Sequence, residues 1–159
     1  MKKSLYAKFK PGPILAYKIG LGPLIGRFVL LLTTTGRKTG LLRVTPLQYE
    51  VIDGVFHIGA VFGMKTDWVR NIQADPHVQV QVKDSTFYGQ AEVSTDPEDI
   101  ADFIQYRLNK HPRLIGLIMK LDGFTSRPTR EEMIDYSKNL ALVRITPEPQ
   151  EEEYTDLSD

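Results

Sequence analysis

The chain has 159 residues, with 20 lysines and arginines, 20 aspartates and glutamates, three histidines and no cysteine. This length predicts one domain with a sizeable core, and the absence of cysteine excludes disulfides and cysteine-ligated zinc. His57, His77 and His111 are too widely separated for a metal-binding motif, so no metal site is expected.

The net charge of zero conceals a strong asymmetry along the chain. Residues 1–49 contain nine lysines and arginines and no acid, whereas residues 148–159 contain six acids and no base. We expect residues 1–147 to form a single domain, with 1–26 as a basic N-terminal segment, and residues 148–159 to form an acidic, disordered tail. The basic third suits an anionic ligand, an acidic lipid surface or nucleic acid. It lacks the interleaved exposed aromatics of single-strand-binding surfaces, so no nucleic-acid partner is expected.

The N-terminal part carries no sign of a secretory signal or a membrane span. No uninterrupted apolar segment precedes Pro11, and the apolar stretch of residues 19–32 is short and is broken by Arg27. We therefore expect a cytoplasmic protein. Peripheral contact with the inner face of the membrane, through the basic N-terminal segment, stays open.

The first half of the chain reads as three strands. After residues 11–26, which are rich in Gly and Pro, the unbroken apolarity of FVLLLTT (28–34) predicts a buried strand. The turn GRKTG leads to RVTPLQYEV (43–51), where Pro46 cannot donate to a ladder, so we expect an edge, a bulge or a ligand there. Asp53-Gly54 predicts a hairpin turn before the third strand, VFHIGAVF (55–62).

The second half mixes helices and strands. Thr66 is the expected cap of a helix over 67–74 that has Trp68, Asn71 and Ile72 on one face. HVQVQV and TFYGQAEV alternate as a second hairpin. Helices are predicted from Pro97, over 112–121 and after the capping box that begins at Thr129, and LALVRIT is the last strand. The order predicts an α+β fold, an antiparallel sheet curled into a small barrel with flanking helices.

The stretch TTTGRKTG, residues 33–40, has the crowded cations and glycines of a phosphate-binding loop. It is not a Walker A motif, in which Lys and Ser/Thr follow the second Gly and a helix begins, because a strand follows here. Two cations, a hydroxyl and turn amides would suit an anionic ligand. A solvated hairpin tip is the alternative.

Two blocks, LLLTTTGRKTGLLRVTPL and GAVFGMKTDWVRNIQADPHVQVQV, together resemble the deazaflavin-dependent nitroreductase and quinone reductase family. The likeness extends over residues 15–147. It implies an antiparallel split β-barrel, shared with FMN-binding proteins of the pyridoxamine-phosphate-oxidase type. It also implies an oxidoreductase that uses the deazaflavin coenzyme F-420 (F420) and passes a hydride to an organic acceptor.

The resemblance assigns cofactor-binding residues in four groups. The turn that would hold the phosphate of the coenzyme's phospholactyl side chain is Arg37, Lys38 and Thr39. The strand along the deazaflavin ring is Arg43, Val44, Thr45, Pro46, Leu47 and Gln48. The strand end at the polar edge of the ring is Gly59, Ala60, Val61 and Phe62. The helix that walls the pocket supplies Asp67, Trp68 and Asn71, with a plain core role as the alternative for Trp68.

No catalytic side chain is assigned. His111 and Tyr106 are candidates to donate a proton, although structural roles are favoured for both. Relatives that reduce nitroimidazoles carry tyrosines near His111, Leu114 and Leu117 and a serine near Val61, and this chain has neither. We therefore expect an apolar lining from Leu114, Leu117 and Ile118.

Such a lining favours a hydrophobic acceptor, such as a quinone or another unsaturated or nitro compound. Two alternatives stay open. One is the same barrel with FMN, whose phosphate would use the same turn. The other is a non-enzymatic barrel that binds a cofactor or a lipophile.

Overall fold

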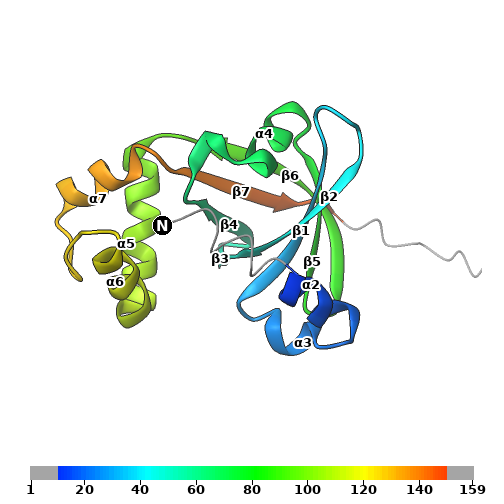
Figure 1. Ribbon diagram of the computed structural model, residues 1–159, viewed down its shortest axis with the longest axis horizontal. Coiled ribbons are helices and arrows are strands. Elements are labelled where there is room, and N and C mark those ends of the chain that lie inside the picture. The colour runs from blue at the N-terminus through cyan, green and yellow to red at the C-terminus, as the bar shows by residue number, and fades with distance from the viewer. Residues whose placement is uncertain (1–10, 150–159) are drawn as a thin grey trace, which may run out of the picture.

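The computed structural model of the chain describes residues 11–149. Its centre is a seven-stranded antiparallel sheet in the order β2-β1-β5-β6-β7-β4-β3, which curls into a split barrel (Figure 1). The strands are β1 (Val29–Thr35), β2 (Leu42–Gln48), β3 (Glu50–Ile52), β4 (Val55–Ala60), β5 (His77–Val82), β6 (Ser85–Ser94) and β7 (Ala141–Pro147). The predicted α+β split barrel is confirmed.

Helices surround the barrel on three sides. They are α2 (Pro11–Lys18), α3 (Gly22–Ile25), α4 (Asp67–Ala74), α5 (Pro97–Lys110), α6 (Pro112–Leu121) and α7 (Arg130–Ser137), with a 3-10 turn η1 (Gly63–Lys65) before α4. In Figure 1, α5, α6 and α7 form a lobe beside the sheet, α4 lies near the β1–β2 turn, and α2 and α3 lie at the opposite end of β1.

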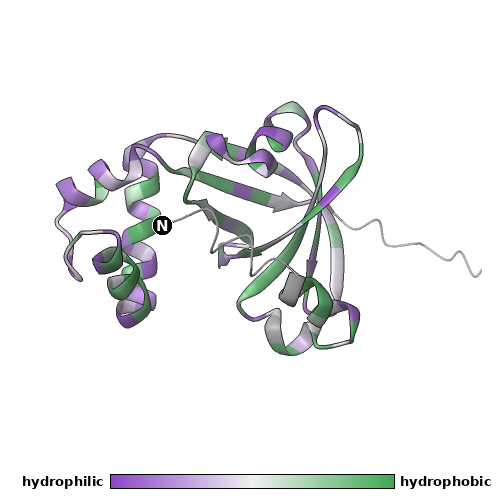
Figure 2. Ribbon diagram, in the orientation of Figure 1, coloured by the Kyte–Doolittle hydropathy of each residue, from purple (hydrophilic) through white to green (hydrophobic). Residues whose placement is uncertain are grey.

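The apolar side chains form two clusters. The barrel core contains Leu30, Leu32, Ile58, Val69, Ile72, Val78, Val80, Val143 and Ile145. The helical core contains Ile100, Phe103, Ile104, Ile115, Met119, Met133 and Leu142. Strand β7 serves both clusters, because successive side chains of a strand point to opposite faces, and Figure 2 shows its apolar character.

The predicted strand RVTPLQYEV is two strands that pair at opposite edges of the sheet. Strand β2 pairs with β1, whereas β3 pairs with β4. The break falls at Tyr49, whose hydroxyl donates to the Gly26 carbonyl and whose ring packs against Phe56. Pro46 stands in β2 opposite Leu31, and β2 is an edge strand, so the predicted edge position of this proline is confirmed.

The third predicted strand is also shorter than expected. Strand β4 ends at Ala60, and Val61 and Phe62 turn into η1. Gly63 is needed in this turn: its φ is +50°, and a Cβ there would lie 2.5 Å from the Asn139 carbonyl oxygen. Thr66 stands at the cap position of α4, but its side chain makes no capping hydrogen bond, so that prediction is wrong in its mechanism.

Local signals placed the other ends correctly. Asp53 and Gly54 both have positive φ, as a tight hairpin turn requires. Asp96 caps α5 by accepting from the Glu98 amide at 3.0 Å, and Thr129 and Glu132 form the predicted capping box.

The C-terminal strand continues its contacts to Glu148. Its amide donates to the Tyr88 carbonyl at 2.9 Å, and its carboxylate lies 3.2 Å from His77 Nε2. Glu148 therefore belongs to the folded domain, although it is the first residue of the expected tail. Residues 150–159 of that tail and residues 1–10 of the basic segment lie outside the described residues.

Candidate cofactor site

A cavity of about 510 Å³ opens between the β1–β2 turn, β2 and the first turns of α4. Two of its lining residues, Gly36 and Thr66, are not among those predicted. The other nine are predicted cofactor-binding residues: Arg37, Lys38, Thr39, Arg43, Val44, Thr45, Asp67, Trp68 and Asn71. The fold therefore brings the basic turn and the α4 wall to one place, which we call the basic cavity.

The β1–β2 turn uses most of its own amides. The Gly36 amide donates to the Leu41 carbonyl at 2.8 Å, and the Thr39 and Gly40 amides donate to the Gly36 carbonyl. The Leu41 amide donates to Thr39 Oγ1 at 3.3 Å. The expectation that turn amides would hold an anion is therefore wrong for most of the turn. The side chains that project from the turn are the groups left to bind an anion.

The Asn71 side chain holds the β1–β2 turn in place. This side chain is 4% exposed, and its Oδ1 accepts from the Arg37 amide at 3.2 Å and from Arg37 Nη1 at 3.1 Å. Its Nδ2 donates to Thr34 Oγ1 at 3.2 Å. Asn71 therefore acts as the anchor that joins α4 to the turn, a connection across 34 residues of sequence.

The three cations of the cavity differ in whether other side chains bind them. Arg37 is held by Asn71 and by Asp67, whose Oδ1 lies 3.1 Å from Nη2. Within residues 11–149, Lys38 and Arg43 have no ion-pair partner. Asp67 offsets one of the three positive charges, so the cavity keeps a net positive charge that an anion can neutralise.

Two hydroxyl groups in the lining of the cavity can donate hydrogen bonds to an anion in addition to the cations. Thr39 Oγ1 accepts from the Leu41 amide, which leaves its hydrogen free to donate. Thr66 Oγ1 is buried and has no hydrogen-bond partner in the described part of the chain. Unpaired buried hydroxyls are unfavourable, so this orphaned group at the wall indicates a cavity built for a polar ligand. The donor set fits a phosphate-bearing side chain such as that of F420.

Trp68 is both a core residue and part of the wall of the basic cavity. Its side chain is 7% exposed and belongs to the barrel core, and it also lines the basic cavity. It is the only tryptophan of the chain, so its fluorescence reports on this wall alone.

The remaining predicted residues lie outside the basic cavity. Pro46, Leu47 and Gln48 continue along β2 toward the helical lobe, where Arg107 Nη2 lies 3.5 Å from Gln48 Oε1. The others are at the end of β4, which contacts β2: Gly59, Ala60, Val61 and Phe62. Gly59 is exposed, and a Cβ there would lie 3.7 Å from the Phe103 ring.

The helical lobe presents an apolar face. Leu114 and Leu117 on α6 are 49% and 55% exposed, whereas Ile118 packs partly against the helical core. Two of the three expected lining residues are therefore available to a ligand.

A buried carboxylate positions this lobe. Glu50, 8% exposed in its side chain, lies 2.7 Å from Lys110 Nζ, 3.1 Å from His111 Nε2 and 3.7 Å from Arg107 Nε. The hydrogen bond to Glu50 raises the pKa of Lys110 above its ordinary value. Glu50 thereby ties the end of α5 and the start of α6 to β3, which gives His111 a structural contact. Tyr106 faces Lys110, whose Nζ lies 5.6 Å from the ring centroid.

Residues 17–114 match the family described as F420H2-dependent quinone reductase. The matched segment covers more than half of the chain and contains every residue that lines the basic cavity.

Solved structures share the fold at low sequence identity. One is an F420 reductase, at 18% identity and a TM-score of 0.52, over 77% of this chain and 87% of that chain. A conserved hypothetical protein from Mycobacterium tuberculosis has 23% identity and a TM-score of 0.55, over 79% of each chain. The heme storage protein HutZ from Vibrio cholerae has 17% identity and a TM-score of 0.54, over 85% of this chain and 91% of that chain. Such different ligands on one scaffold mean that the fold alone does not select the ligand.

Proposed function

The chain belongs to the F420H2-dependent quinone reductase family, and on that premise we propose that it reduces a quinone or a similar hydrophobic unsaturated acceptor. It is an F420-dependent oxidoreductase. The observation that supports a site in this chain is the basic cavity, where Lys38 and Arg43, which have no ion-pair partner among residues 11–149, stand beside the hydroxyls of Thr39 and Thr66.

In this proposal the residues of the basic cavity have different roles. Lys38 and Arg43 hold the anionic side chain of the cofactor by charge-assisted hydrogen bonds, and Asn71 and Asp67 keep Arg37 in place. Trp68 closes the inner wall of the cavity and excludes water. Reduced F420 supplies the hydride when it is bound. Protein side chains then need only bind, orient and shield the reactants.

The exposed leucines of α6 favour a hydrophobic acceptor. Leu114 and Leu117 offer apolar surface in place of hydroxyl donors. Burial of an acceptor's tail against them contributes roughly 25 cal/mol per Å². Nitro reduction and quinone reduction both build negative charge on oxygen, which hydroxyl donors stabilise. Only an acceptor with an apolar tail gains from burial on this face, so the face favours quinones over nitroimidazoles.

Two measurements test the proposal. In fluorescence titrations at physiological salt we expect F420 to bind more tightly than FMN. Equal or tighter binding of FMN would contradict the cofactor assignment for this cavity. With reduced F420, we expect turnover of a menaquinone analogue and little turnover of a bicyclic nitroimidazole at matched concentration, followed by the return of F420 absorbance. Leu117→Ser should raise the KM for the quinone, whereas Leu121→Ser, the same change beyond the predicted lining, should not.

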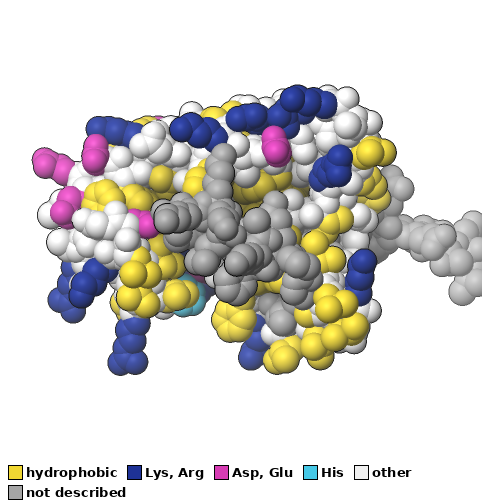
Figure 3. Space-filling model, in the orientation of Figure 1, with side chains coloured by type: hydrophobic (Ala, Val, Ile, Leu, Met, Phe, Trp, Pro, Cys, Tyr) yellow, Lys and Arg dark blue, Asp and Glu magenta, His cyan; other side chains and the backbone are white. Residues whose placement is uncertain are grey.

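The α2–α3 region supports peripheral contact with an acidic membrane, where quinones dissolve. Leu15, Ile19, Leu24 and Phe28 are between 59% and 66% exposed, and Figure 3 shows apolar side chains over this corner with basic ones beside them. None of the described helices is long and apolar enough to cross a membrane. We expect the protein to sediment with phosphatidylglycerol vesicles and less with phosphatidylcholine. Phe28→Ser should reduce that binding, and unchanged sedimentation would refute this contact.

A further inference from the structure

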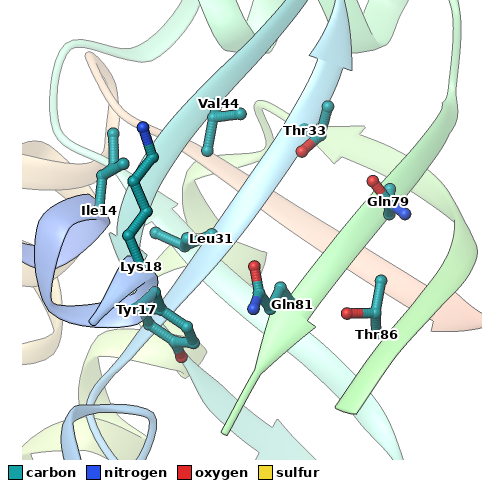
Figure 4. Close-up of a pocket in the computed structure, with 9 residues that line it drawn as sticks. All are labelled: Ile14, Tyr17, Lys18, Leu31, Thr33, Val44, Gln79, Gln81 and Thr86. Carbon is teal, nitrogen blue, oxygen red and sulfur yellow. The ribbon is translucent and has the colours of Figure 1, made fainter. Parts of the chain in front are cut away.

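A second cavity lies on the outer face of the sheet. It has a volume of about 380 Å³ and crosses strands β2, β1, β5 and β6 beside helix α2 (Figure 4). Leu30, Leu32, Val78 and Val80 point into the barrel core, so their neighbours in sequence face outward and form the floor of this groove. We call it the outer groove.

Helix α2 is fixed in place over one end of this groove. The Tyr17 side chain is 8% exposed, and its hydroxyl donates to the Val29 carbonyl at 2.7 Å and accepts from the Lys83 amide at 3.3 Å. Lys18, the next residue, extends along the groove in Figure 4. The position of its ammonium group is therefore set by a well-anchored helix.

The outer groove offers many donors. Its polar side chains are Lys18, Thr33, Gln79, Gln81 and Thr86, and none of the residues 11–149 that line it carries a carboxylate. Within residues 11–149 none of these five side chains makes a hydrogen bond or an ion pair. An ammonium, two amides and two hydroxyls without partners are suited to a ligand that carries carboxylates and amides.

The outer groove and the basic cavity share one lining residue on the edge strand. Val44 on the edge strand β2 lines both of them. The groove then crosses three strand-to-strand steps, which amount to about 14 Å at the usual spacing. An extended peptide-like chain of a few residues has this length. A ligand held by Lys38 and Arg43 can therefore extend past Val44 along a path that no carboxylate of residues 11–149 lines.

We propose that the outer groove binds the glutamate tail of F420. The inference rests on the proposed function, because it needs the phosphate-bearing side chain in the basic cavity. Each glutamate of the tail brings one carboxylate and one amide, the two groups that the unpartnered donors of the groove can bind. Lys18 pairs with a tail carboxylate, and Gln79 and Gln81 bind tail amides and carboxylates.

The test compares F420 that carries several glutamates with the form that carries none, in fluorescence titrations of the same protein samples. In the wild type we expect the tail to tighten binding about tenfold, with a gain that shrinks as salt rises. Lys18→Met should weaken binding of the glutamate-bearing form about two- to fivefold, as expected for the loss of an exposed ion pair. Gln79→Glu with Gln81→Glu should abolish the gain. Both variants should bind the tail-free form as the wild type does, and Lys120→Met, an equal charge loss on α6, should change neither form.

Other results would contradict the proposed binding of the tail in the outer groove. Equal binding of both forms by the wild type, or an equal loss of both forms in the groove variants, would overturn the inference and leave the proposed function intact. Failure of the wild type to bind even the tail-free form would overturn the proposed function and the groove together. A groove variant that changes the mass in analytical ultracentrifugation would assign the groove to a contact between copies of the chain.

Discussion

Asn71→Ala should weaken the fold and the cofactor site at once. The substitution removes three hydrogen bonds, two from Arg37 and one to Thr34. It also leaves the Thr34 hydroxyl, on a residue 1% exposed, without its partner. Neutral bonds contribute about 0.5–1.5 kcal/mol each and one from a charged group more, so we expect a loss of about 3 kcal/mol in the free energy of unfolding.

The assay is urea unfolding followed by circular dichroism, together with the thermal midpoint. For a domain of this size the loss corresponds to a fall of about 6–12 °C in Tm. Asn71→Asp is the matched control. It keeps both acceptor contacts to Arg37, and the Thr34 hydroxyl can donate to it, so it should be more stable than the alanine variant.

The two variants separate stability from binding. The aspartate variant places a negative charge at the wall of the basic cavity, so it should fold yet bind F420 weakly. If Asn71→Ala unfolds within about 0.5 kcal/mol of the wild type, the ordinary range for a surface change, the turn is not anchored through this side chain. Tight binding of F420 by Asn71→Asp would show that this wall of the cavity is not part of the anion-binding site.

Three further outcomes follow from other contacts. Lys38→Glu should weaken F420 binding by at least about 1.5–3 kcal/mol, the range for a hydrogen bond to a charged group, and an unchanged affinity would identify the turn as a solvated hairpin tip. Trp68 fluorescence should be quenched by the cofactor, and Trp68→Phe should keep the fold, whereas emission indifferent to F420 would favour a pure core role. The hydrogen bond from Arg144 holds the pKa of Asp99 below its ordinary value. Its stabilisation is therefore fully present above that ordinary value and is lost as the pH falls through the lowered one. The stability difference between wild type and Asp99→Asn should shrink in acid, and a difference independent of pH would contradict this.

The sequence predicted the elements well where the signals are local. Alternation in residues 77–93, the Asp53-Gly54 turn and the caps at Asp96 and Thr129 each depend on a few neighbouring residues. The split at Tyr49 was missed because the pairing partner of a strand is a property of the whole sheet. Nothing in RVTPLQYEV shows that its two halves join opposite edges.

For the candidate site too, the sequence showed the local features and missed those that depend on distant residues. The basic turn was visible as a motif, but the state of its amides depends on the Leu41 carbonyl and on Asn71, which is far away in sequence. The unpaired hydroxyl of Thr66 was hidden because the residue has the position of an ordinary helix cap. The outer groove had no sequence signal, since its donors come from four separate elements that only the folded sheet brings together.

The separation of the barrel core from the helical core has a consequence for how such proteins diversify. Ile115 and Met119 hold α6 in the helical core, whereas Leu114 and Leu117 contribute to neither core. Exchange of such exposed side chains usually changes stability by less than about 0.5 kcal/mol. The turn at Arg37, by contrast, is bound to a buried asparagine. If α6 binds the acceptor and the turn binds the cofactor, as we propose, random mutation can explore new acceptors on α6 at little risk to folding, while selection for stability alone preserves the turn.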